Sequence, residues 1–186
     1  ILIIDNQSVQ PETLAFFESL KQDQNLRLLA YLHPFNISAI NNHAANMAMG
    51  EVLFFLNDDI EVISDNWLRE MASQAIRPDI GAVGPMLYYP DDTIQHAGVV
   101  LGLNRVAGHI YQGQPRGYRG QRNRAVLPQN LTALTAACLA LEKNKFLQIS
   151  GFDETHLPVA FNDIDMCIRM VQAGFRNLST PHLELY

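Results

Sequence analysis

Cysteine is scarce in this chain of 186 residues, since only Cys138 and Cys167 are present, far apart and within apolar segments. Two isolated cysteines exclude a disulfide framework and a cysteine-based zinc site, so we expect buried free thiols in a reducing compartment. No run approaches the roughly 18 consecutive apolar residues of a membrane-spanning helix, and no signal peptide opens the sequence. These absences predict a soluble, cytoplasmic chain.

Positive charge is also in short supply, with 13 lysines and arginines against 19 aspartates and glutamates, and a net charge of -6. A nonspecific nucleic-acid binder needs a basic face, so the composition excludes nucleic acid as a partner of this kind. The only basic run spans residues 116–124 and is interrupted by glycines. We interpret this run as a solvated loop, with a patch for anionic ligands as the alternative.

Strand and helix patterns alternate through the first half of the chain. Strand patterns cover residues 1–4, 26–32 and 51–56, and helical patterns cover residues 11–21, 38–49 and 64–76. This alternation favours an α/β fold with a mostly parallel sheet and helices on both faces. The apolar content of 48% suffices for one core, so we expect a single domain over residues 1–186.

The chain opens on a fully apolar run, Ile1 to Ile4, which predicts a buried parallel strand. A domain rarely starts inside its own core, so we expect this chain to be a fragment of a longer protein.

The regular alternation of strand and helix patterns ends after Pro78. Strand-like runs at residues 81–89, 94–103 and 131–141 and an amphipathic helix at residues 161–173 follow. The first two runs flank a turn and are typical of a hairpin. A long connection at residues 104–129 indicates a functional loop or a disordered one, and we expect residues 105–128 to be mobile or partly helical and to cover the acceptor side. His96 and His109 are lone histidines in these surroundings, which favours structural roles over acceptor contact.

Two acidic clusters lie far apart in the sequence. Asn57, Asp58 and Asp59 follow the apolar run at residues 52–55, so their side chains emerge where a buried strand ends. Carboxylates there suit a hard divalent cation such as Mg²⁺ or Mn²⁺. The second cluster, at residues 162–165, opens the last helix and is the candidate source of a general base. Together the two clusters indicate transfer of a group from a diphosphate donor.

The order of these motifs resembles the family 2 inverting glycosyltransferases with a GT-A fold, and most of all members that build bacterial surface polysaccharide, including rhamnosyltransferase-like proteins. The resemblance is carried by Ile3 to Ser8, Asn42 to Gly50-Glu51, Phe55 to Asp59, Gly151-Phe152-Asp153-Glu154, and Asp163-Ile164-Asp165 with Arg169 and Gly174. It covers nearly the whole chain. The family's opening strand has no counterpart here, so we expect the Rossmann-like sheet to lack its N-terminal strand.

On the donor side, the resemblance implies that Asp5 contacts the nucleotide base or ribose. Asn57, Asp58 and Asp59 match the family's metal motif, usually Asp-x-Asp. Asp59 is then the residue that binds Mg²⁺ or Mn²⁺ at the donor diphosphate, with Asn57 and Asp58 beside the donor. Because Asn57 replaces the first carboxylate, Asp59 is expected to provide most of the direct coordination.

On the acceptor side, the resemblance implies that Asp163 is the catalytic base that deprotonates the acceptor hydroxyl. Arg169 matches the arginine that follows on the same helix, and Asp153 matches the acidic residue of a turn near the acceptor. The implied partners are a nucleotide-sugar donor and a saccharide or lipid-linked acceptor. We expect peripheral association of the full-length protein with the inner face of the cell membrane. Asp59 and Asp163 should then face a common cavity at the carboxyl ends of the strands.

Structural roles compete with each of these interpretations. Asp58 and Asp59 can end a strand and cap a turn, and Asp163 and Asp165 can complement a helix dipole. Arg169 lies four residues after Asp165, which favours an ordinary helical ion pair. At the level of function, a nucleotidyltransferase of similar architecture and a noncatalytic carbohydrate-binding domain remain alternatives.

Overall fold

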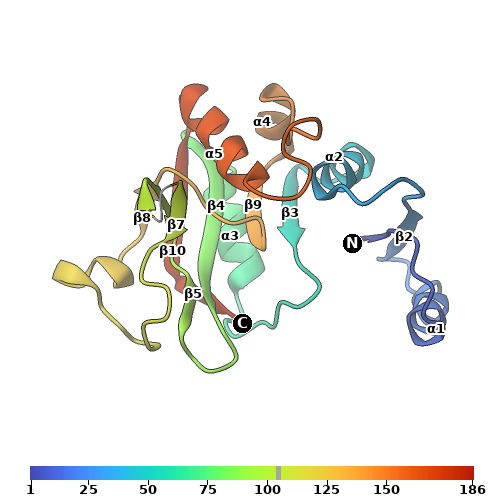
Figure 1. The fold of residues 1–186 in the computed structure, drawn as a ribbon, viewed down its shortest axis with the longest axis horizontal. Helices are drawn as coiled ribbons and strands as arrows, with labels where there is room; N and C mark the ends of the chain where they lie inside the picture. The colour runs from blue at the N-terminus through green and yellow to red at the C-terminus, as the bar shows by residue number, and fades with distance from the viewer. Residues whose placement is uncertain (104–105) are drawn as a thin grey trace.

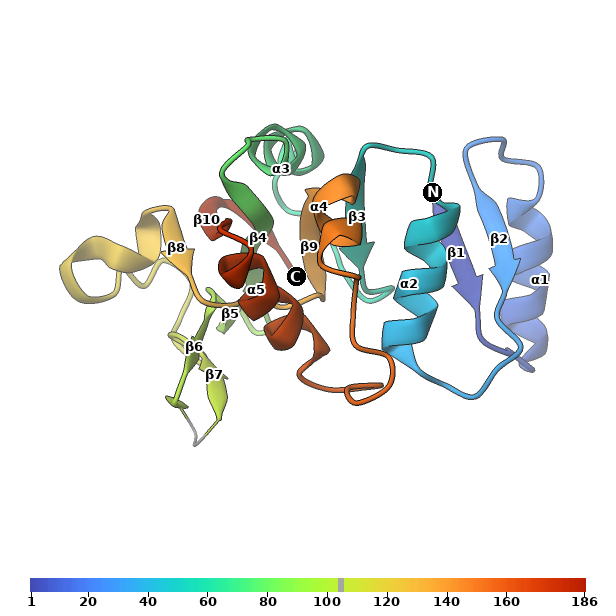
Figure 2. The same cartoon turned by 90° about the horizontal axis from the view of Figure 1, so that it is seen from above.

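The computed structural model describes residues 1–103 and 106–186, which form a β-sheet with helices packed on both faces (Figures 1 and 2). The strands are β1 (Leu2–Asp5), β2 (Arg27–Ala30), β3 (Val52–Leu56), β4 (Ile80–Tyr88), β5 (Ile94–His96), β6 (Val99–Leu101), β7 (Ala107–His109), β8 (Gln129–Leu131), β9 (Cys138–Glu142) and β10 (Arg176–Leu185). The helices are α1 (Pro11–Leu20), α2 (Ile37–Met47), α3 (Trp67–Ala75), the 3₁₀ segment η2 (Gln121–Val126), α4 (Lys143–Gln148) and α5 (Asn162–Gln172). The predicted alternation of strands and helices over the first half is confirmed.

The central sheet has the order β3-β9-β4-β10-β8, with β5 beside β4. β4 and β10 pair in parallel, and β9 runs antiparallel to both β3 and β4. β3, β4 and β10 therefore point the same way, with β9 inserted between two of them. The α/β class is confirmed, and the reversed strand β9 is the feature that alternation alone did not predict.

The two faces of the sheet are covered by different helices. Along β9, Cys138 and Ala140 face the core that contains Met71 of α3, because successive strand residues point to opposite faces. Leu139 and Leu141 face the other core, to which α4 and α5 contribute. This two-sided burial explains why residues 52–55 and 138–141 are continuous apolar runs.

β1 and β2 form a separate parallel pair at one end of the molecule, beside α1 (Figure 2). The prediction of a parallel strand at the start of the chain is confirmed, but the prediction that it is buried is wrong. Ile1 is 81% exposed, and Leu2–Asp5 are only half buried. The physical reason is that β1 pairs with a single strand within the described residues, so one of its edges is uncovered.

The expected hairpin after Pro78 is confirmed, since β4 and β5 pair antiparallel. The run at residues 94–103 is divided into β5 and β6 by Gly98, whose φ is +105°. A Cβ atom there would collide with the side chain of Leu131, and the positive φ is one that residues with a side chain rarely adopt, so this bend favours glycine. β6 then pairs with β7 instead of continuing along β5.

The connection from residue 106 to residue 128 is partly helical, as predicted, through η2. It is tied to the sheet by Arg116, whose Nη2 lies 2.6 Å from Oε2 of Glu184. Asn104 and Arg105, which the prediction of a long loop included, lie outside the described residues. A lid over the acceptor stays a prediction.

Candidate functional site

The first acidic cluster lies at the end of β3. The backbone N–H of Asn57 donates to the carbonyl of Ala137 at 2.9 Å, which fixes the point where the chain leaves the sheet. Asp58 and Asp59 follow as exposed residues, and their side chains make no hydrogen bond or ion pair within the described part of the chain. Four carboxylate oxygens are therefore free for a ligand.

These oxygens suit a hard cation. Within residues 1–103 and 106–186, no group of three histidine, cysteine, aspartate or glutamate side chains lies close enough together to form a complete metal site. Mg²⁺ and Mn²⁺ are commonly held by one or two carboxylates, with substrate phosphates and water supplying the other ligands. Asp59 with Asp58 fits this second kind of site, in which a diphosphate completes the coordination.

Asp163 lies in the first turn of α5. Its Oδ2 accepts a hydrogen bond from the backbone N–H of Ala136 at 3.1 Å, and its Oδ1 accepts one from Ile164 at 2.8 Å. The preceding residue, Asn162, is buried, and its side chain donates to Oγ of Ser38 at 2.8 Å. The start of α5 is thus fixed against α2, and the Asp163 carboxylate is half buried with both oxygens oriented.

The two acidic clusters converge on one dipeptide. The carbonyl of Ala137 accepts from Asn57, and the N–H of Ala136 donates to Asp163. Segments about a hundred residues apart in sequence are therefore held to neighbouring residues of the chain just before β9. The structure brings the metal motif and the candidate base together, while a cavity shared by Asp59 and Asp163 stays a prediction.

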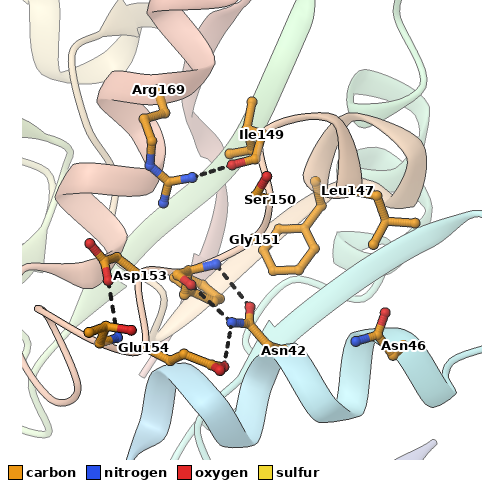
Figure 3. Close-up of a pocket in the computed structure, with 12 residues that line it drawn as sticks. Asn42, Asn46, Leu147, Ile149, Ser150, Gly151, Asp153, Glu154 and Arg169 are labelled. Carbon is orange, nitrogen blue, oxygen red and sulfur yellow. Dashed lines mark hydrogen bonds between the residues drawn. The ribbon is translucent and has the colours of Figure 1, made fainter.

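A cavity of about 700 Å³ lies between α2, α4 and the turn that precedes α5 (Figure 3). Two of the predicted site residues, Asp153 and Arg169, line it together with Asn42 and Glu154. Asp59 and Asp163 are not among its lining residues. The predicted residues therefore fall into two groups, one at the Ala136–Ala137 dipeptide and one at this cavity.

Arg169 makes the structural contacts that its spacing indicated. Its Nε donates to Oδ2 of Asp165 at 2.8 Å, and its Nη1 donates to the carbonyl of Ile149 at 2.5 Å (Figure 3). The guanidinium thus joins α5 to the end of α4. Contact of Arg169 with a substrate stays a prediction.

Asp153 organises the turn at residues 153–156. Its Oδ1 accepts from the backbone N–H groups of Thr155 and His156 at 3.0 and 2.9 Å. The hydrogen bond from the backbone of His156 is the main cause that holds the pKa of Asp153 below its usual range, and a hydrogen bond from the His156 ring adds to it. The carboxylate is therefore ionised at neutral pH.

Asn42 is a residue whose role the sequence did not reveal, although it belongs to the motifs that carry the family resemblance. From α2, its Oδ1 accepts from the N–H of Phe152 at 2.9 Å and its Nδ2 donates to the carbonyl of the same residue at 2.9 Å (Figure 3). Nδ2 also donates to Oε2 of Glu154 at 3.0 Å. A polar residue on the buried side of a predicted helix was the available signal.

Asp5 lies at the end of β1, where its Oδ1 accepts from the backbone N–H of Ser8 at 2.9 Å. The side chain of Asn6 bonds the carbonyls of Tyr31 and His33, which joins this turn to the end of β2. β1, β2 and β3 point in the same direction (Figure 2), so Asp5 and the metal motif leave the strands at the same end. Contact with a nucleotide stays a prediction.

The two lone histidines lie against each other. Nδ1 of His96 is 2.8 Å from Nδ1 of His109, and the rings meet edge to face. His96 is fully buried, and burial, together with its neighbour His109, lowers its pKa to about 3. Burial also lowers the pKa of His109, and the negative charge of Asp163 opposes that shift.

Comparison with solved structures defines the fold. The fold is that of GT-A glycosyltransferases. A crystal structure of GalNAc-T7 with UDP, GalNAc and Mn²⁺ superposes with a TM-score of 0.78 at 14% identity, covering 99% of this chain and 36% of that one. The mannosyltransferase PcManGT from Pyrobaculum calidifontis, in complex with GDP-Man and Mn²⁺, gives a TM-score of 0.67 at 14% identity, covering 99% of this chain and 46% of its own.

Residues 1–146 match the family model described as Glycosyl transferase family 2. The chain belongs to this family. The resemblance noted from its motifs and the expected GT-A fold are both confirmed.

Curated relatives are longer than this chain. It is 46% identical over 187 residues to the uncharacterized protein y4gI of Sinorhizobium fredii and 40% identical over 186 residues to the O-antigen biosynthesis protein RfbC of Myxococcus xanthus. Each match covers all of this chain but only 21% and 14%, respectively, of the relative. An N-acetylglucosaminyl-diphospho-decaprenol L-rhamnosyltransferase of Mycobacterium tuberculosis is 26% identical over 118 residues, which is 58% of this chain and 37% of that protein. Among the described residues, no helix combines the length and apolar character that crossing a membrane requires.

Proposed function

We propose that this chain is the catalytic domain of an inverting glycosyltransferase that moves a sugar from a nucleoside-diphosphate donor to a saccharide or lipid-linked saccharide acceptor. The observation that carries the proposal is the convergence of the metal motif and Asp163 on Ala136 and Ala137. Inverting transfer needs a donor diphosphate and an acceptor hydroxyl on opposite sides of one anomeric carbon. The backbone of Asn57, which precedes Asp58 and Asp59, and the carboxylate of Asp163 bond adjacent residues, and this arrangement supports that need.

On the donor side, Asp59 and Asp58 would hold Mn²⁺ or Mg²⁺, and the two structural neighbours crystallised with Mn²⁺ favour Mn²⁺. A divalent cation supplies Lewis-acid stabilisation of the charge that grows on the leaving diphosphate. The protein's own contribution is to keep the two carboxylates exposed and unpaired where β3 ends. Asp5, at the same end of the strands, is proposed to contact the nucleotide, with Asn57 beside the diphosphate.

On the acceptor side, Asp163 is proposed to take the proton from the attacking hydroxyl. Each of its oxygens accepts one backbone N–H and keeps a second lone pair for that proton. The same backbone bonds fix the direction of the carboxylate, and general-base assistance is worth about 10²–10⁴-fold in rate. One displacement without a covalent intermediate inverts the anomeric configuration. Asp153 and Arg169 are proposed to contact the acceptor at the neighbouring cavity.

The biological setting is proposed from the relatives. RfbC acts in O-antigen biosynthesis, and the name of the mycobacterial relative specifies a diphospho-decaprenol acceptor. We therefore place this chain in surface polysaccharide synthesis, with a lipid-linked acceptor and peripheral association at the cytoplasmic face of the membrane. Residues 1–186 would form one glycosyltransferase domain of a longer protein. An additional strand beside the free edge of β1 would complete the sheet.

The test is transfer by the full-length protein with Mn²⁺ and a panel of UDP-, GDP- and thymidine-diphosphate sugars, read as release of the nucleoside diphosphate and as donor binding. Asp163→Asn should abolish transfer and leave donor binding nearly unchanged. The control is Asp65→Asn, the same change at an exposed acid outside α5, which should retain transfer. Release of a sugar 1-phosphate in place of a nucleoside diphosphate would indicate a nucleotidyltransferase instead.

The metal motif is tested separately by Asp59→Ala. This change should weaken donor binding in the presence of Mn²⁺ and leave the weak binding in EDTA unaltered, because the lost carboxylate acts through the cation. Asp65→Ala, an exposed acid a few residues further along, is the control and should bind the donor as the unmodified protein does. Saccharide binding without any transfer would support a noncatalytic domain and overturn the proposal.

A further inference from the structure

One stretch of this acidic chain carries only positive charge. All 19 aspartates and glutamates lie outside residues 93–141, which contain five arginines. Arg116 is held within the fold, because it forms an ion pair with Glu184. Three others are exposed and form no ion pair within the described part of the chain, namely Arg119, Arg122 and Arg124. These three cationic groups face solvent without a counter-charge from the protein.

The β6–β7 hairpin, in the same stretch, ends in apolar side chains. Leu101, Leu103 and Val106 are 48%, 41% and 60% exposed, whereas Val99 at the base of the hairpin is buried. A single exposed apolar residue is ordinary, but three within six positions at the end of one projection form a local apolar surface. Such a surface suits contact with an apolar phase.

The arginines and the hairpin are held at the same end of the molecule. Tyr111, two residues after β7, lies edge to face against Tyr118 with ring centroids 5.6 Å apart. The Tyr111 ring also packs against Gly120, where a Cβ atom would lie 2.9 Å from its Cζ. The segment that begins the arginine run therefore rests on the base of the hairpin, at the end of the molecule away from β1 and α1 (Figure 2).

The hairpin extends to the side of the sheet towards which β1, β2 and β3 point (Figure 2). Asp58 and Asp59 leave β3 on this side. The base of the hairpin is also joined to the segment that holds Asp163, because the N–H of Val99 donates to the carbonyl of Ala133 at 2.9 Å, three residues before Ala136. A partner that contacts the hairpin is therefore brought close to the candidate site.

We propose that the hairpin tip and the three arginines form a docking surface for an anionic lipid bilayer. Leu101, Leu103 and Val106 enter the boundary between headgroups and acyl chains, and the arginines bind anionic headgroups. Apolar burial and attraction to anionic lipid together produce peripheral binding. The inference rests on the proposed function, because it assigns a surface to the membrane association proposed there.

The first test is cosedimentation of the full-length protein with vesicles of phosphatidylglycerol and phosphatidylcholine. Binding should be tighter than to phosphatidylcholine alone and should weaken as salt is added, because salt screens exposed charges. Arg119→Gln, Arg122→Gln and Arg124→Gln together should weaken binding roughly 100-fold, which corresponds to about fivefold for each charge. The three corresponding changes to lysine keep the charge and should retain binding.

The charge control removes three exposed cations elsewhere, through Lys21→Gln, Arg69→Gln and Arg77→Gln. Lys21 follows α1, and the other two lie on or just after α3, which is on the opposite side of the sheet from the hairpin tip (Figure 2). This variant has the same net charge as the glutamine variant of the docking surface. It should bind the vesicles as the unmodified protein does.

The apolar tip is tested by Leu101→Asn with Val106→Asn, which should weaken vesicle binding about tenfold. Leu68→Asn with Ile76→Asn is the control, since these residues are 51% and 56% exposed on α3 and at its end. The control pair should leave vesicle binding unchanged. Thermal unfolding of each variant identifies a loss of binding caused by misfolding.

The inference is overturned if the unmodified protein does not bind anionic vesicles, or if the glutamine variant of the docking surface binds them equally well. Unchanged vesicle binding with a raised KM for a soluble anionic saccharide would assign the arginines to that ligand and also overturn it. Release of nucleoside diphosphate without vesicles tests the proposed function separately. Its absence with every donor would overturn transfer, whereas vesicle binding would still be measured.

Discussion

At the scale of single residues, the acidic side chains of the site differ in how much of their hydrogen-bonding capacity the protein already uses. Asp153 accepts two backbone N–H groups and the ring of His156, whereas Asp163 accepts one N–H on each oxygen. Asp58 and Asp59 accept none within the described residues. This gradient matches the tasks proposed for Asp163 and for Asp58 and Asp59, since a base needs a free lone pair and a cation ligand needs several, whereas Asp153 uses most of its capacity within its own turn.

His96 makes a prediction about the pH dependence of stability. Its pKa falls from the ordinary 6.5 to about 3 on folding. Between these pH values, the residue binds a proton in the unfolded chain but not in the folded chain. The stabilisation is fully present above pH 6.5 and is lost as the pH falls from 6.5 towards 3, by about 1.4 kcal/mol for each pH unit.

Urea unfolding at pH 7.5, 6.0 and 5.0 measures this loss, above the range in which most carboxylates titrate. His96→Asn keeps a donor near the position of Nδ1 but cannot titrate, so its stability should fall less steeply over the same interval. Parallel curves for the two proteins would contradict the prediction.

At the scale of elements, α2 acts as a polar clamp on the segment that leads into α5. Asn36 donates to the carbonyl of Glu154 at 2.9 Å, and Ser38 donates to the carbonyl of Leu157 at 2.6 Å. Asn42 bonds both the N–H and the carbonyl of Phe152. Ser38 and Asn42 share one side of the helix because they are four positions apart, and Asn36 is the N-cap residue that precedes it. The direction of Asp163 therefore depends on α2 as well as on its own helix.

Lys145 of α4 plays a comparable role at the end of α3. Its ammonium group donates to the carbonyls of Ala75, Arg77 and Ile80 at 3.2, 2.6 and 2.8 Å and lies 3.0 Å from a carboxylate oxygen of Glu142. The residue is only 6% exposed. A cation at the C-terminus of a helix is favoured by the helix dipole, and here it also satisfies carbonyl groups that the helix leaves unpaired.

Lys145→Met should lower the free energy of unfolding by about 3–5 kcal/mol, because it leaves buried carbonyls and the Glu142 carboxylate without a partner. Lys21→Met is the matched control, since Lys21 is exposed and pairs only with Glu18, a kind of contact worth about 0–1 kcal/mol. Chemical denaturation of the two variants measures the difference. Equal midpoints would show that the buried ammonium is not needed.

At the scale of the whole molecule, the sequence predicted the elements better than the contacts between them. Residues 52–55 pack alternately against the helices on the two faces of the sheet, so every position is apolar. This continuous apolar run is the signal that predicts a buried strand. The direction of β9 could not be predicted in this way, since an antiparallel central strand buried on both faces has the same composition as a parallel one. The half-buried state of β1 could not be predicted, because an apolar run does not show which neighbouring strands are present to cover it.

The candidate site shows the same division. Asp59 and Asp163 were singled out because carboxylates at a strand end and at a helix start have recognisable settings, and the family resemblance added roles to them. The sequence did not predict the His96–His109 contact, because it depends on the bend at Gly98, after which β6 pairs with β7 and His109 lies against His96. A histidine in an apolar strand looks the same in sequence whether it meets a second ring or not.

The link between the two acidic clusters is made by the main chain of Ala136 and Ala137 and not by their side chains. The relative placement of the end of β3 and the Asp163 carboxylate therefore depends on one peptide unit, whose length no substitution alters. Side-chain changes at these alanines would keep both hydrogen bonds, whereas inserting a single residue between them would shift Asp163 relative to Asn57.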